Sequence, residues 1–321
     1  MDLPRLWVGI DVIGTLIHGE IVVHSAGGRR VARRLRRVAP KLGYDYQGEN
    51  LFRGVVTDAM SGPRIDCART AGGIECRLHW VIAFDGTAVG LVVWLAPGPV
   101  PPRPVYNSWT IDLARLITAG GGDNLTLYGV KRQVGEYKPF PVLLKNMIPD
   151  DAPGFTAMIH NLRHEREGVL CDTLWSVRPG TTWNHLWSSA TTLGAPGPGR
   201  TVYGLTTQLP HRDLDARLGT LVRYTGATLV MVDVVDRVVI NASGDVAEAL
   251  LADEQRLRGV LAQIDLDAVI GEADTEPVVE QMISIEGSLF RAALFALPAR
   301  PVQPGSVIAI LLVAAPQRSW D

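Results

Sequence analysis

Residues 170–209 read LCDTLWSVRPGTTWNHLWSSATTLGAPGPGRTVYGLTTQL, and this stretch decides the fold. Three runs rich in Val, Thr and Trp are separated by two turn clusters, Arg178-Pro179-Gly180 and the segment 194–199. β-Branched and aromatic side chains suit a pleated sheet surface, whereas Pro and Gly interrupt the hydrogen-bond ladder. The stretch therefore predicts an antiparallel three-strand meander.

The same pattern occurs at 64–95 and again at 278–315. An order of two strands, helices and a meander recurs about every 100 residues, as a structural repeat with little residue identity. Such an order gives an antiparallel sheet with helices on one face, so the predicted fold class is α+β. We expect three domains, at 1–103, 104–212 and 213–321, the first ending in the proline-rich linker PGPVPPRPV (97–105).

Composition narrows the class of protein. Of the 321 residues, 47% are hydrophobic and 20% charged, so the chain can bury a sizeable core. The net charge of −2 argues against nucleic acid as a partner, and three cysteines are too few for a disulfide scaffold. The N-terminus, with an acid at position 2, lacks the basic region of a signal peptide, and no apolar run reaches the roughly 20 residues of a membrane span. These features predict a cytoplasmic location.

Local patterns predict individual elements. Residues 6–24 indicate two strands joined by a turn, and RRVARRLRRVA (29–39) has the apolar spacing of a helix. We expect helices at 110–118, at 214–224 and within 244–261, and a strand at 125–130. A helix is predicted to start near 150, with Asp150 or Asp151 as its N-cap.

Two stretches of the middle third resemble PAS sensory domains. MIPDDAPGFTAMI (147–159) resembles the segment that starts a PAS helix, and 171–209 resembles the final three PAS strands. The Pro179-Gly180 turn and Trp183 stand where those domains often have Asp-Gly and an aromatic residue. The whole chain is similar to an actinobacterial (mycobacterial-type) family of stand-alone PAS–GAF–PAS tandem proteins. That resemblance implies a sensory protein without an attached output enzyme; it assigns GAF to the middle domain, whereas the residues themselves indicate PAS.

Aromatic residues of the meander are the first candidate site. One face of a PAS-like sheet packs on helices and lines a ligand cavity, while the other packs on a neighbouring domain. Aromatic side chains with one polar tip suit both roles, and core or interface packing is the expectation we favour over ligand lining. The candidates are Trp175, Trp183, His185, Trp187 and Tyr203.

An arginine cluster is the second candidate, as a basic patch for nucleic acid, an acidic partner or a membrane surface. Its members are Arg29, Arg30, Arg33, Arg34, Arg36 and Arg37. The competing interpretation, which we favour, is a solvated helix face whose apolar stripe packs on the sheet.

Metal and thiol motifs are weak. His160 and His164 stand four apart with Cys171 nearby, but no fourth ligand can be named and no HExxH motif is present, so we expect surface histidines, no metal and no cofactor. Cys67 and Cys76 flank Gly72-Gly73: a turn at 71–72 would place the two thiols opposite each other, whereas a turn at 72–73 would separate them. Reduced thiols are the expectation.

No convergent set of nucleophile, base or metal ligands appears, so we do not expect an enzyme. The leading hypothesis is a sensory protein that binds a small ligand or a protein partner through PAS/GAF-type domains. The alternative is an interaction scaffold or dimerisation module, such as a homodimer, whose domain cores are filled.

Overall fold

A computed structural model describes residues 2–179, 182–210, 212, 222, 224–266, 279–296 and 307–315. The chain forms three antiparallel sheets with few helices, which confirms the α+β class. The N-terminal sheet contains β1 (Trp7–Asp11), β2 (Val22–Ala26), β3 (Arg29–Arg34), β4 (Cys67–Ala71), β5 (Ile74–Ile82) and β6 (Ala88–Pro97). Its helices are α1 (Val12–His18), α2 (Leu35–Leu42) and α3 (Tyr46–Ser61).

The middle sheet contains β7 (Tyr106–Asp112), β8 (Ile117–Gly122), β9 (Lys138–Pro139), β10 (Leu170–Val177), β11 (Asn184–Thr191) and β12 (Thr201–Leu209). Between β8 and β10 come η1 (Leu125–Tyr128), α4 (Phe140–Leu143), η2 (Pro149–Asp151) and α5 (Ala152–His164). The C-terminal sheet contains β13 (Thr228–Asp233), β14 (Val238–Gly244), β15 (Val279–Ile285), β16 (Ser288–Ala296) and β17 (Val307–Ala314), with α7 (Ala247–Ala252) and α8 (Glu254–Leu261).

All three sheets repeat one strand order. The order is β3-β2-β1-β6-β5-β4 in the N-terminal sheet and β9-β8-β7-β12-β11-β10 in the middle sheet. The C-terminal sheet has the order β14-β13-β17-β16-β15. This is the same order, but among the residues that the structure describes no strand corresponds to β3 or β9. In each sheet the first strand pairs with the second and with the last strand of the meander, which agrees with the structural repeat expected from the sequence.

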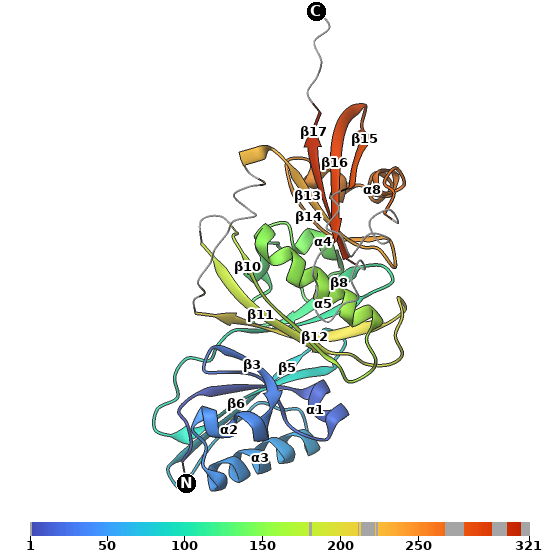
Figure 1. Ribbon diagram of the computed structural model, residues 1–321. Helices are drawn as coiled ribbons and strands as arrows, with labels where there is room; N and C mark the ends of the chain where they lie inside the picture. The colour runs from blue at the N-terminus through green and yellow to red at the C-terminus, as the bar shows by residue number, and fades with distance from the viewer. Residues whose placement is uncertain are drawn as a thin grey trace, which may run out of the picture.

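The sheets and helices form successive layers (Figure 1). Helices α2 and α3 cover one face of the N-terminal sheet, with Leu35 and Phe52 in its core. The other face packs on the middle sheet through an apolar cluster that includes Trp94 and Leu205. Helix α5 covers the far side of the middle sheet and contacts the C-terminal sheet, because its apolar residues share one core with Met231. In the part of the chain described, no helix is long and apolar enough to cross a membrane.

Several local predictions were wrong. Helix α1 interrupts 6–24, because the Asp11 carboxylate accepts a hydrogen bond from the Gly14 N–H and caps a helix there. Residues 29–34 are strand β3, since Gly27 and Gly28 both take positive φ and close a tight hairpin with β2. The helix begins only at Leu35.

Other outcomes follow the turns. Residues 106–122 form the β7–β8 hairpin where a helix was expected at 110–118, and 125–128 form the 3-10 helix η1 where a strand was expected. Both meander hairpins of 170–209 and the helices within 244–261 are confirmed. The helix expected at 214–224 lies outside the described residues except for 222 and 224.

Gly204 offers a test of packing in the middle sheet. A Cβ at Gly204 would lie 2.0 Å from Cζ2 of Trp109, a rigid ring held between sheet and helix. Gly204→Ala is therefore expected to reduce the free energy of unfolding by about 1–3 kcal/mol. The control is Gly199→Ala, where a Cβ meets nothing within 4 Å, and we expect a change within about 0.5 kcal/mol. Urea unfolding of the two variants measures the difference, and equal stabilities would contradict this packing.

Candidate functional site

The two faces of the meander separate the candidate aromatic residues. Trp175 lies opposite Leu186 in the β10–β11 ladder, whereas Trp187 lies opposite Leu174. Trp175 and Leu186 therefore share the face that α5 covers, and both belong to that core. Trp187 projects from the opposite face toward the N-terminal sheet, where its indole N–H donates to the His24 carbonyl at 3.2 Å.

Hydrogen bonds join the two sheets around Trp187. Nδ1 of His24 lies 2.7 Å from the Ser189 hydroxyl, and the Thr191 hydroxyl donates to the Asp11 carboxylate at 2.7 Å. His24 is fully buried. Tyr203 also bridges the sheets, because its hydroxyl donates to Asp85 in the β5–β6 turn at 2.7 Å. Trp187 and Tyr203 are thus interface residues.

Trp183 and His185 contact residues of their own sheet and its turn. Trp183 directly precedes β11, and its ring stacks on that of His185 with 6.4 Å between centroids. The Arg178 guanidinium carbon stands 5.5 Å from the Trp183 ring centroid, and His185 bonds the Ser176 hydroxyl at 3.0 Å through Nδ1. Both aromatic side chains have protein partners, and neither lines the cavity between the middle sheet and its helices.

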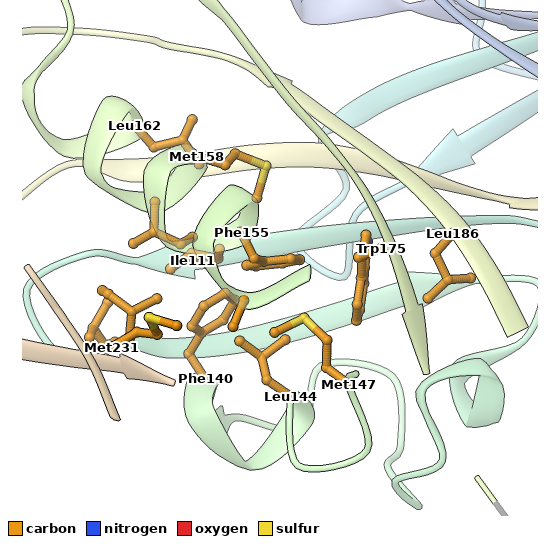
Figure 2. Packing of buried hydrophobic residues seen from close by; sticks show 14 of the residues in the cluster. Ile111, Phe140, Leu144, Met147, Phe155, Met158, Leu162, Trp175, Leu186 and Met231 are labelled. Carbon is orange, nitrogen blue, oxygen red and sulfur yellow. The ribbon is translucent and has the colours of Figure 1, made fainter. Parts of the chain in front are cut away.

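A cavity of about 30 Å³ lies between the middle sheet and its helices. Its wall includes Trp175, Phe155 and Phe140, which Figure 2 shows side by side. The Trp175 ring stacks on Tyr128, with 5.6 Å between centroids, and meets Phe155 edge-on at 4.8 Å. The full lining is Trp109, Ile111, Thr118, Tyr128, Arg132, Phe140, Leu143, Leu144, Phe155, Met158, Trp175, Ser188 and Thr206.

Most polar groups of the cavity bond one another. The indole N–H groups of Trp175 and Trp109 donate to the Ser188 and Thr206 hydroxyls at 2.9 and 3.1 Å, respectively. These two hydroxyls lie 2.6 Å apart. This part of the wall is a satisfied network, which holds the rings in place.

Arg132 differs from the rest of the lining. The residue is only 9% exposed, yet its Nε and Nη2 have no hydrogen-bond partner. The guanidinium lies on the backbone of Gly120, where a Cβ would come within 2.7 Å of Nη2. Burial lowers the pKa of Arg132, against weaker opposing effects of Tyr128 and Glu136. The cavity therefore combines aromatic walls with a guanidinium that has two donors free.

The arginine cluster is spread over two elements. Residues 29–34 lie on edge strand β3, while Arg36 and Arg37 lie on α2. Arg34 and Arg36 pair with Glu20 at 3.2 and 3.3 Å, and Arg30 stands over the Trp187 ring at 5.9 Å. The single basic helix face that the sequence suggested does not exist, and a charged edge strand resists pairing with another chain.

The histidine prediction was wrong. His160 is 6% exposed, and its Nδ1 lies 2.9 Å from a carboxylate oxygen of fully buried Asp233. Burial alone would raise the pKa of Asp233, but His160, His164 and Arg163 outweigh it and lower that pKa. These side chains are buried because the C-terminal sheet packs on α5. The contact joins residues 160 and 233, which are far apart in the sequence.

The thiols follow the second of the two turns considered. Gly72-Gly73 closes the β4–β5 hairpin, so Cys67 pairs with Leu78 and Cys76 with Arg69. All three cysteines are free.

Arg132, Tyr128 and Trp109 were missed by sequence reasoning. Phe155 and Met158 carry a signal, since they are three apart on the apolar face of a helix that was predicted. Arg132 carries none, because it lies in an irregular segment among other charged residues.

The whole chain is similar in fold to the crystal structure of an uncharacterized protein from Mycobacterium tuberculosis. The TM-score is 0.65 at 15% identity, with 98% of this chain and 97% of that chain covered. A solved RNA-binding light-oxygen-voltage receptor aligns with 65% of this chain and 95% of its own, at 11% identity and a TM-score of 0.26, too low to establish a shared fold. No protein-family model and no curated protein matches the chain.

The interface histidine makes stability depend on pH. Burial lowers the pKa of His24 to about 3, whereas the unfolded chain protonates near 6.5. Between pH 6.5 and 3 the unfolded state binds a proton that the folded state does not bind. The free energy of unfolding is therefore highest above pH 6.5 and decreases as the pH falls below that value. Urea unfolding between pH 7.5 and 5 should show this loss, up to about 1.4 kcal/mol per pH unit below 6.5.

His24→Gln retains a hydrogen-bonding group for Ser189 and removes the titration. We expect its stability to fall less steeply with acid than that of the wild type. Gly199→Ala, which changes no titratable group and meets nothing within 4 Å, should keep the wild-type slope. An unchanged slope in His24→Gln would contradict the assignment.

Proposed function

We propose that this chain is a sensory protein that binds a small anion, a carboxylate, in the middle-sheet cavity beside Arg132. It acts through PAS/GAF-type domains in the cytoplasm, without catalysis, by changing how its sheets present themselves to a protein partner. The observation that carries the proposal is the buried Arg132 guanidinium with Nε and Nη2 unpartnered. A buried charged donor without a partner costs free energy, which an anion in the cavity would recover.

The chemistry of the cavity favours a carboxylate. A guanidinium presents parallel N–H donors that match two carboxylate oxygens, and Nε with Nη2 is one such pair of donors. Aromatic walls exclude water and strengthen the ion pair. The volume of about 30 Å³ limits the ligand to a few non-hydrogen atoms in this arrangement of α5 and the sheet.

Two further observations support a sensory role. In each domain a strand pair comes first, helices follow, and a three-strand meander closes the sheet; β3 and β9 are added strands at the edge of the N-terminal and middle sheets. This is the layout on which the resemblance to PAS and GAF domains rests. The lining contains hydroxyls, at Ser188 and Thr206, but no carboxylate or imidazole that could activate them as nucleophiles. A binding site without turnover fits that lining better than an enzyme does.

The second candidate is a scaffold or homodimer with filled cores. The small volume of the cavity favours it, since ligand pockets for larger molecules occupy about 300–1,000 Å³. In that case the buried faces serve architecture alone, and the partner binds elsewhere.

Arg132→Met tests the proposal. The full chain is titrated with sodium formate, acetate, glycolate and pyruvate at fixed ionic strength, with chloride as reference, and the melting temperature is followed. At least one carboxylate should raise the melting temperature of the wild type, because a ligand that binds only the folded state stabilises it. Arg132→Met should lose that rise, and its own ligand-free stability should equal or exceed that of the wild type, since an unpaired buried charge is removed.

Arg115→Met is the matched control, because the Arg115 side chain is 76% exposed. It should respond to carboxylate as the wild type does. A rise that persists in Arg132→Met, or no rise for any carboxylate in the wild type, would contradict anion binding. The second outcome together with a dimer in light scattering would favour the scaffold.

A further inference from the structure

Three potential metal ligands meet where α5 contacts the C-terminal sheet. His160 and His164 are four residues apart on α5, so they lie on one face of the helix, and their rings are 4.4 Å apart. Asp233 ends β13 opposite this face. One ligand atom from each residue lies within 4.8 Å of the other two.

The distances suit a tetrahedral ion. With bonds of about 2.0–2.1 Å, two ligands of a tetrahedral zinc ion lie about 3.3 Å apart. Nε2 of His164 lies 3.5 Å from Oδ2 of Asp233, and Nδ1 of His160 lies 2.9 Å from the same oxygen. The ligand nitrogens of the two imidazoles lie within 4.8 Å of each other, so rotation of the two rings toward the ion would close the set.

The carboxylate is already oriented. Oδ1 of Asp233 accepts the backbone N–H of Val235 at 3.1 Å, which leaves Oδ2 toward both imidazoles. Arg163 pairs with neighbouring Asp236 and donates to the Leu113 carbonyl, so Asp236 is held beside the group. Partners of this kind, which fix the ligands, characterise metal sites.

One ligand atom has no other role. Nε2 of His164 is buried and makes no hydrogen bond, although carboxylate oxygens of Asp233 and Asp236 stand 3.5 and 3.4 Å away. That spacing is too long for a hydrogen bond and right for an ion between the atoms. The His164 side chain as a whole is 29% exposed, which provides a route from solvent.

We propose that His160, His164 and Asp233 bind a divalent transition-metal ion of the zinc class, with Asp236 next to the fourth position. Two imidazoles and one carboxylate are a ligand set that Zn²⁺ accepts. The ion would tie α5 to β13 and so fix the C-terminal sheet against the middle one. This site is independent of the carboxylate proposed beside Arg132.

The test is zinc titration of the chelator-treated full chain by calorimetry, together with the visible spectrum after Co²⁺ loading. We expect a zinc-binding event of one ion per chain and a Co²⁺ spectrum of tetrahedral intensity in the wild type. His164→Gln, at a half-buried position, should weaken that event at least tenfold and lose the spectrum. His18→Gln, a histidine outside the group, should retain both.

Asp233→Asn is the second variant, since it keeps the size of the side chain and removes the charge. It should weaken zinc binding at least tenfold while circular dichroism stays that of the wild type. If Asp233→Asn does not fold, His164→Gln decides alone. Absence of the one-ion event in the wild type, or its survival in His164→Gln, would overturn the proposal.

Discussion

The middle sheet is covered on both faces, by the N-terminal sheet on one and by α5 on the other. Apolar contact of this kind is strong but has no direction, so it would not by itself fix how one sheet lies on another. Buried hydrogen bonds are directional, and two of them join these sheets: His24 with Ser189 and Thr191 with Asp11. Few other positions of one sheet on the other would keep both bonds. Each such group costs free energy if its partner moves away, which makes the relative position of the two sheets specific.

Helix α5 belongs to two interfaces because a helix presents several faces. Phe155 and Met158 line the cavity of the middle sheet, while His160 and Arg163 reach the C-terminal sheet. A ligand in the cavity would contact the first face, and a displacement of the helix would then change the contacts of the second face. Such coupling needs two arrangements of α5 with different affinity for the ligand, since a ligand that binds both equally shifts nothing. The ion pairs to Asp233 and Asp236 are the contacts that would differ between them.

The sequence predicted what short-range patterns determine. The turn residues at 178–180 and 194–199 correctly predicted the two hairpins of the meander. Asp85-Gly86 correctly predicted the hairpin between β5 and β6. The Arg29–Arg34 strand was missed because its apolar spacing fits a helix equally well, and only pairing with β2 decides. Trp175 and Trp187 could not be assigned to cavity and interface, since that depends on which sheet covers which face. His160 and Asp233 are 73 residues apart, so no local pattern relates them.

Three buried arginines show why Arg132 stands out. Arg200 donates Nε, Nη1 and Nη2 to the carbonyls of Ala195, Leu162 and Gly194. Arg163 donates to Asp236 and to the Leu113 carbonyl. In both residues, protein oxygens replace the water molecules that burial removes from the guanidinium N–H groups. These hydrogen bonds hold a loop in place at Arg200 and an interface at Arg163. Arg132 is buried to a similar degree, but its Nε and Nη2 make no hydrogen bond. A cost of about 1–3 kcal/mol or more for a buried charged donor is large against the 5–15 kcal/mol by which domains are stable. A protein can retain such a cost at a position where the buried group binds a ligand. The aromatic cavity beside Arg132 is the place where a ligand could reach this guanidinium.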